Sequence, residues 1–213
     1  MVEKSCTLES VVNKMNQSFW RNRKVLITGH TGFKGGWLIK LLHGLGAEIV
    51  GVSNTDMGPL SLYNVLGLNS HLSNTNYGLD DFIDILDVSS LQTVFQKFNP
   101  EIVFHLAAQP IVINSFKAPY LTHQTNFMGT LNLLEASRIN ANLSVFISVT
   151  TDKVYQNNGD IFSFRETDAL GGHDPYSASK ACADILTQSY FKSFFNERAR
   201  CCNCFILLLL ILS

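Results

Sequence analysis

The chain has 213 residues, a formal net charge of −1 and 46% hydrophobic residues. This length suits one α/β domain, and the balanced charge without a basic stripe argues against a nucleic-acid-binding surface. Five cysteines, with three at Cys201, Cys202 and Cys204, match neither a disulfide framework nor a zinc site. With no apolar signal segment at the N-terminus, these features predict a cytoplasmic protein without a metal and without a membrane anchor.

Strand and helix patterns alternate along the chain after a polar segment, residues 1–22, that we interpret as an N-terminal extension. Alternating strands and helices predict a doubly wound parallel sheet of the Rossmann type, here over residues 23–196, with ligands beyond the carboxyl ends of the strands. The expected strands are 24–28, 48–52, 82–86, 102–106 and 144–149. The expected helices are one with its apolar stripe at 37–45, a turn near 62–66, and helices at 89–98, 119–139 and 175–195.

The pattern changes after residue 196. Residues 197–213 end in the apolar run Phe205–Leu212, which is too short for a membrane-spanning helix of roughly 20 residues. The run has the length of a buried strand. We expect either a sixth strand of the sheet or a tail left by a truncation or frameshift, and the sequence alone leaves both interpretations open.

Three glycines spaced by three, Gly29, Gly32 and Gly35, directly follow the first expected strand. Glycines between a strand and a helix permit a tight turn and the approach of a pyrophosphate to the helix N-terminus. The motif therefore predicts a dinucleotide site, although a purely structural turn is the alternative. The second strand ends in Gly51–Asn54, without the acidic residue that commonly binds the ribose 2′-hydroxyl of NAD, so this position does not separate NAD from NADP.

Tyr176 and Lys180 lie four residues apart in the last expected helix and so share one face. An ammonium group beside a phenol lowers the pKa of the phenol, which predicts an acid–base pair for moving a hydroxyl proton. The alternative is an exposed Tyr and Lys at ordinary helical spacing.

Polar residues Thr151, Asp152 and Lys153 follow the fifth expected strand, at the edge where a substrate would bind. Thr151 can hydrogen-bond a sugar hydroxyl, Asp152 can protonate a leaving hydroxyl, and Lys153 can remove a carbon-bound proton if burial lowers its pKa. The alternative is a capping turn that begins a loop.

Six segments together resemble the CDP-glucose 4,6-dehydratases, which belong to the extended short-chain dehydrogenase/reductase superfamily. The resemblance covers about residues 16–196. Lys153 is the feature most specific to this family, because the related dTDP-glucose and GDP-mannose dehydratases have Glu at this place. The matching segments are Ser18–Trp20, Gly29–Trp37, His105–Pro110, Asn126–Thr130, Thr151–Tyr155 and Leu170–Lys180.

The resemblance implies a lyase that uses tightly bound NAD in an internal redox cycle on a nucleotide-sugar, in deoxysugar or lipopolysaccharide biosynthesis, and a homo-oligomer. It implies that Tyr176 takes the C4 hydroxyl proton, Lys153 takes the C5 proton, and Asp152 helps to expel the C6 hydroxyl. Lys180 would bind the nicotinamide ribose, with Asp84 and Ile85 at the adenine. The remaining cofactor-binding residues it implies are Gly29, Thr31, Gly32, Phe33, Gly35, Leu106, Ala107 and Ala108, together with Tyr176.

The resemblance ends near Asn196, whereas chains of this family continue through most of the nucleotide-sugar pocket. Two alternatives to an active dehydratase therefore remain: an inactive, truncated NAD-binding fragment, and another nucleotide-sugar epimerase or dehydratase of the superfamily. Lys153 argues against the second alternative.

Overall fold

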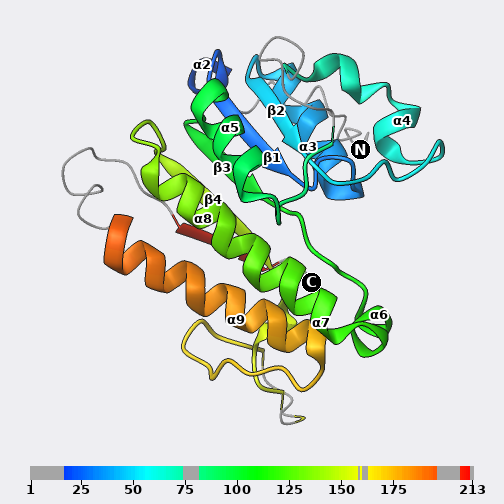
Figure 1. Cartoon of the computed structure of the whole chain (residues 1–213), viewed down its shortest axis with the longest axis vertical. Coiled ribbons are helices and arrows are strands. Elements are labelled where there is room, and N and C mark those ends of the chain that lie inside the picture. The colour runs from blue at the N-terminus through cyan, green and yellow to red at the C-terminus, as the bar shows by residue number, and fades with distance from the viewer. Residues whose placement is uncertain (1–16, 74–81, 158, 160–162, 196–206, 212–213) are drawn as a thin grey trace, which may run out of the picture.

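The computed structural model describes residues 17–73, 82–157, 159, 163–195 and 207–211, which form a parallel sheet with helices on both faces (Figure 1). Within these residues the sheet has five strands in the order β2-β1-β3-β4-β5, all parallel. The predicted doubly wound fold is confirmed. The strands are β1 (Lys24–Thr28), β2 (Glu48–Val52), β3 (Ile102–His105), β4 (Val145–Thr150) and β5 (Leu207–Ile211).

Apolar side chains fill the core on both sides of the sheet, because alternate residues of a strand point to opposite faces. On β1, Val25 and Ile27 pack with α3 (Phe33–Gly44), whereas Leu26 packs with α5 (Val88–Phe98) and α8 (Gly129–Ile139). Burial on both faces explains why the central strands read as continuous apolar runs.

The remaining helical segments agree with most of the expected ranges. Asp87 caps α5 by accepting hydrogen bonds from the backbone of Ser89 and Ser90, and Asn99, with φ of 54°, ends that helix in the left-handed conformation. The other segments are α2 (Gln17–Trp20), α4 (Leu62–Val65), α6 (Val112–Lys117), α7 (Pro119–His123), α9 (Pro175–Tyr190), the 3₁₀ turns η1 (Leu68–His71) and η4 (Asp152–Val154), and the π-helical turns η3 (Gln124–Met128) and η5 (Phe191–Phe195).

The expected strand at 82–86 is wrong. The Asp84 side chain accepts a hydrogen bond from the Leu86 backbone at 2.9 Å, and the Asp87 backbone donates to the Asp84 carbonyl at 3.0 Å, so the segment closes a turn. Ile83 and Ile85 are buried in the core all the same, which is why the apolar pattern resembled a strand.

The apolar C-terminal run contributes β5, which is the fifth strand of the described sheet rather than a sixth. It pairs in parallel with β4, from Phe146 opposite Leu207 to Thr150 opposite Ile211. Residues 1–16, 196–206 and 212–213 lie outside the described residues, so the boundaries of the extension and of the tail stay predictions.

Candidate functional site

The turn between β1 and α3 is shaped by close backbone contacts. Gly29 has a φ of +70°, and a Cβ there would lie 2.8 Å from the Ala107 nitrogen; a Cβ at Gly35 would lie 2.4 Å from the Gly29 oxygen. The fold itself therefore requires these two glycines. A Cβ at Gly32 would approach only the Gly29 oxygen, at 3.3 Å, and no side chain caps the N-terminus of α3 at this residue.

A pocket of about 400 Å³ lies beyond the carboxyl ends of β1, β2 and β3, and we call it the Gly29 pocket. It brings together most of the cofactor-binding residues expected from the sequence. Phe33, which is 71% exposed, and Gly35 do not line it, nor do Tyr176 and Lys180. The expected residues that line it are Gly29, Thr31, Gly32, Asp84, Ile85, Leu106, Ala107 and Ala108.

The floor of the Gly29 pocket is held by Thr31, which is nearly fully buried. Its hydroxyl pairs with the Ser53 hydroxyl at 2.8 Å and donates to the Thr55 carbonyl at 3.0 Å. These contacts join the glycine turn to the end of β2 and leave the pocket open between two fixed backbone segments.

Tyr176 and Lys180 share one face of α9, whose first turn is fixed by the Asp174 cap and by Pro175. The buried Lys180 ammonium donates to the Val149 carbonyl at 2.8 Å, and burial lowers its pKa to about 8. Burial raises the pKa of the half-buried Tyr176, and the carboxylates of Asp152 and Asp174 raise it further. The expected lowering of the Tyr176 pKa by Lys180 is therefore absent from this structure, in which the ammonium is bound to a carbonyl.

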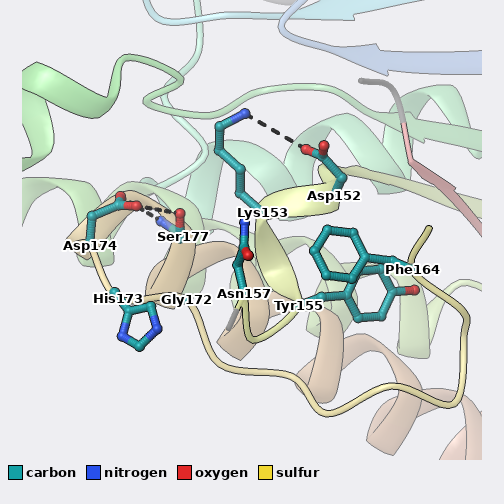
Figure 2. Close-up of a pocket in the computed structure, with 9 residues that line it drawn as sticks. All are labelled: Asp152, Lys153, Tyr155, Asn157, Phe164, Gly172, His173, Asp174 and Ser177. Carbon is teal, nitrogen blue, oxygen red and sulfur yellow. Dashed lines mark hydrogen bonds and ion pairs between the residues drawn. The ribbon is translucent and has the colours of Figure 1, made fainter. Parts of the chain in front are cut away.

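Asp152 and Lys153 lie in η4, directly after β4. Thr151 caps this turn: its hydroxyl accepts from the Lys153 backbone at 3.4 Å and donates to Asp152 Oδ1 at 3.0 Å. Lys153 Nζ lies 3.7 Å from Asp152 Oδ1; the Lys153 side chain is exposed and the Asp152 side chain is partly exposed (Figure 2). The capping turn of the alternative interpretation is thus present, and it fixes two oppositely charged side chains side by side.

These two residues line a second pocket, of about 360 Å³, which we call the Lys153 pocket. Its other wall is the pair of rings of Tyr155 and Phe164, stacked with centroids 5.1 Å apart (Figure 2). The loop before α9 closes the pocket, because Gly172 lies so near α9 that a Cβ there would be 2.1 Å from Ser177 Cβ. Sequence reasoning missed several residues that line this pocket. Tyr155, His173 and Asp174 lie in motifs that the sequence analysis singled out, whereas Asn157 and Phe164 lie in none.

A chain of buried hydrogen bonds runs from the Gly29 pocket into the helical layer. The Ala107 backbone donates to Thr28 Oγ1 at 3.1 Å, and Thr28 Oγ1 lies 2.7 Å from His105 Nδ1. His105 Nε2 lies 2.9 Å from Thr130 Oγ1, which in turn donates to the Asn126 carbonyl. Because Thr130 has only one proton, it must accept from Nε2–H, and in the neutral ring Nδ1 then accepts from the Thr28 hydroxyl. Burial lowers the pKa of His105 to about 3, which makes His105 a structural residue rather than an acid or base.

Asn126, in the π-helical turn η3, extends this network to α9. Its Oδ1 accepts from the Gln109 backbone at 2.7 Å, and its Nδ2 donates to the Gln109 carbonyl at 3.2 Å and to Ser179 Oγ at 2.9 Å. Ser179 Oγ donates to the Tyr176 carbonyl at 2.7 Å. The loop beside the Gly29 pocket is therefore hydrogen-bonded to the helix that bears Tyr176 and Lys180.

Neither a metal cluster nor a membrane span is found in the described part of the chain. Its His, Cys, Asp and Glu side chains form no group of three or more that could bind a metal ion. No described helix is long and apolar enough to cross a membrane.

Residues 26–206 match the family profile of GDP-mannose 4,6-dehydratase. The chain belongs to this family. Within it, the chain is 40% identical over 182 residues to a CDP-glucose 4,6-dehydratase of Salmonella typhimurium, covering 85% of this chain and 49% of the relative. It is 37% identical over 184 residues to a dTDP-D-glucose 4,6-dehydratase of Dictyostelium discoideum, covering 81% and 41%. The resemblance drawn from the sequence motifs is confirmed.

Among solved structures, the fold of this family member is similar to that of a UDP-glucose 4-epimerase of Thermus thermophilus in complex with NAD. The TM-score is 0.64 at 27% identity, over 80% of this chain and 51% of the epimerase chain. The chain thus spans about half the length of the relatives that it matches.

Proposed function

We propose that this chain provides the cofactor-binding and acid–base groups of a CDP-glucose 4,6-dehydratase, which converts CDP-glucose to CDP-4-keto-6-deoxyglucose. The observation that supports this proposal best is the Asp152–Lys153 pair, fixed by Thr151 at the mouth of the Lys153 pocket. A carboxyl and an amine side by side suit the removal of a carbon-bound proton and the loss of a hydroxyl from the next carbon. Lys153 is also what distinguishes this chain from dehydratases that have Glu at this place.

The Gly29 pocket fits a dinucleotide. Gly32 presents no side chain to it, and the uncapped N-terminus of α3 offers free N–H groups to a pyrophosphate. Thr31, Ala107 and Asp84 line the same pocket. NAD bound there would accept a hydride and later return it. Gly29 and Gly35 would keep the turn between β1 and α3 tight, and Phe33 would lie beside that turn. Ile85, Leu106 and Ala108 would contact the cofactor.

Asp152 and Lys153 of the Lys153 pocket, together with Tyr176 of α9, would move the protons. Tyr176 takes the proton of the C4 hydroxyl, and Lys180 lies one turn further along α9. The resulting C4 ketone acidifies C5, so Lys153 removes the C5 proton while Asp152 protonates the departing C6 hydroxyl, which leaves as water. Lys153 then returns a proton to C5 as the hydride returns to C6.

A second candidate is a dinucleotide-binding protein that does not turn over a nucleotide-sugar. The observation in its favour is that the chain spans about half the length of its relatives. An epimerase of the same superfamily is less well supported, because epimerization at C4 needs no base for C5 and Lys153 would then have no role.

The test uses a fusion of residues 1–195 to the C-terminal half of the Salmonella relative. Supplied with NAD, the fusion is expected to dehydrate CDP-glucose, measured as the 4-keto-6-deoxy product. Its Lys153→Ala variant should still form reduced nicotinamide from CDP-glucose, seen by absorbance, but should yield no product. Product formation at the normal rate in Lys153→Ala would assign the C5 base elsewhere, and a fusion that binds NAD but never dehydrates CDP-glucose would contradict the proposal.

A further inference from the structure

A line of polar side chains runs along α9 at four-residue spacing. It consists of Tyr176, Lys180, Asp184 and Gln188. Side chains four residues apart lie on the same face of a helix. Tyr176 and Lys180 have roles in the proposed function, whereas Asp184 has none, although only 4% of it is exposed. A carboxylate buried this deeply is unfavourable unless its charge is compensated.

Each of the two buried charges has a fixed hydrogen-bond partner. The Lys180 ammonium donates to the Val149 carbonyl at 2.8 Å, and Asp184 Oδ1 accepts from the Gln188 amide at 2.7 Å. Burial raises the pKa of Asp184, whereas the Gln188 hydrogen bond and the nearby Lys180 ammonium lower it and so favour the carboxylate. Tyr155 also faces this carboxylate. Burial raises the pKa of Tyr155 and Asp184 raises it further, so Tyr155 is a neutral phenol.

The other described groups around the Lys180 ammonium offer it no negative charge. Lys34, on α3, carries a like charge that lowers the pKa of Lys180. His105, on β3, is neutral because burial lowers its pKa to about 3, and Tyr176 is a neutral phenol because burial raises its pKa. Of the described charges that act on Lys180, Asp184 therefore supplies the attraction.

We propose that Asp184 is a positioning residue that keeps the Lys180 ammonium charged for its part in the proposed reaction. The inference rests on the proposed function and adds to it the group that holds the charge of Lys180. A buried amine loses its proton readily, and a neutral Lys180 could not stabilise a Tyr176 phenolate. Asp184 acts through Lys180 and has no contact with the reacting atoms.

The first test measures the pKa of Lys180 in the 213-residue chain by NMR, from the pH dependence of its Cε signal, which is assigned by its loss in Lys180→Arg. Wild type should titrate near pH 8. Asp184→Asn keeps an oxygen to accept from Gln188. It should lower the pKa of Lys180 by at least about one unit, because the opposite charge on the same helix face is lost. Asp184→Glu keeps that charge and should restore the pKa.

Glu135→Gln is the matched control. Glu135 also contacts α9, because its Oε1 accepts from the Tyr190 hydroxyl at 2.7 Å, but its charge is paired with Arg138. This variant should leave the pKa of Lys180 unchanged. Asp184→Ser serves as a second neutral variant, so that the result does not depend on the folding of one protein, and thermal unfolding shows which variants are folded.

The fusion to the C-terminal half of the Salmonella relative provides a measurement that a merely structural role of Asp184 would not change. The pH profile of kcat/KM reports the ionisation of essential groups in the free enzyme. Loss of the Lys180 proton should make kcat/KM fall on the alkaline side. In Asp184→Asn this fall should move to lower pH by the same shift as the pKa of Lys180, whereas structural damage would reduce the rate equally at every pH.

The outcomes separate the inference from the proposed function. An unchanged pKa of Lys180 in folded neutral variants of Asp184, or an equal fall in Glu135→Gln, would overturn the inference whether or not the fusion is active. An alkaline fall that stays at the wild-type pH in Asp184→Asn would also overturn it. A fusion that never dehydrates CDP-glucose would overturn the proposed function, and the NMR titration would still decide whether Asp184 holds the charge of Lys180.

Discussion

Gly32 differs from the other two glycines of its turn in what a side chain there would meet. Gly29 and Gly35 are required by backbone contacts within the protein, but a Cβ at Gly32 would approach only the Gly29 oxygen, at 3.3 Å. Its φ of −73° and ψ of 169° suit any residue. A side chain at this position would therefore meet one tight backbone contact and would enter the Gly29 pocket, which Gly32 lines.

Gly32→Val is accordingly expected to fold and to lose NAD binding, because the branched side chain would occupy the place of the pyrophosphate. Calorimetry with NAD measures the loss, and thermal unfolding shows that the variant is still folded. An NAD affinity equal to that of wild type in a folded Gly32→Val protein would show that the dinucleotide does not bind at this turn.

Tyr176 is the phenol through which the proposed reaction begins. In the fusion protein, Tyr176→Phe should reduce turnover of CDP-glucose by about 10²–10⁴-fold, the usual contribution of a general acid or base. Tyr155→Phe is the matched control, since Tyr155 lines the Lys153 pocket but stacks on Phe164, and it should change turnover less than tenfold. Similar rates for the two variants would assign the proton transfer to another group.

At the scale of elements, the parts of the fold with simple periodicity could be predicted from the sequence. Apolar runs marked the strands at 24–28 and 48–52, and Pro175 marked the start of α9. The strand expected at 82–86 failed because the side chain of Asp84 competes for backbone hydrogen bonds, which an apolar pattern does not reveal. The helix expected over 119–139 is interrupted by η3. There the side-chain amide of Asn126 accepts a hydrogen bond from the Gln109 backbone and donates one to Ser179.

In the candidate site, too, the sequence predicted where residues lie but not their protonation or their contacts across loops. Motifs placed Gly29, Asp152 and Lys153 correctly at the carboxyl edge of the sheet, since the ends of parallel strands meet there. The protonation of Tyr176 could not be predicted, because it depends on where the Lys180 ammonium is bound and on how deeply the phenol is buried. Phe164 was missed because its contact with Tyr155 crosses a loop without periodicity.

Two buried histidines, His105 and His30, make the free energy of unfolding depend on pH. Burial lowers the pKa of His105 from 6.5 to about 3 and that of His30 from 6.5 to about 4. Below pH 6.5 the unfolded chain binds protons that the folded chain does not, so the free energy of unfolding is fully retained above pH 6.5 and falls as the pH drops toward 4. Each histidine contributes up to about 1.4 kcal/mol per pH unit in this window.

Denaturant unfolding at several pH values between 4 and 8 measures this dependence. The variant His105→Gln should show a shallower fall below pH 6.5 than wild type, because one of the two deeply buried histidines is then removed. If both proteins lose stability with the same slope, His105 is not the group that binds the proton on unfolding.

For the whole molecule, the two pockets differ in how much of them this chain supplies. The Gly29 pocket is lined from five separate segments of the described chain, from Gly29 to Thr125, whereas the described lining of the Lys153 pocket comes from 152–177 alone. The relatives that match are about twice as long as this chain. A polypeptide of these 213 residues should therefore bind NAD but should not dehydrate CDP-glucose.

Calorimetry with NAD and a product assay with CDP-glucose test both halves of this prediction on the same preparation. The fusion to the C-terminal half of the Salmonella relative is the positive control, since it restores further lining for the Lys153 pocket while the Gly29 pocket is unchanged. NAD affinity should then be equal in the two proteins, and turnover should be found only in the fusion. Turnover of CDP-glucose by the 213-residue polypeptide itself would show that residues 152–177, with the remainder of this chain, suffice to bind the nucleotide-sugar.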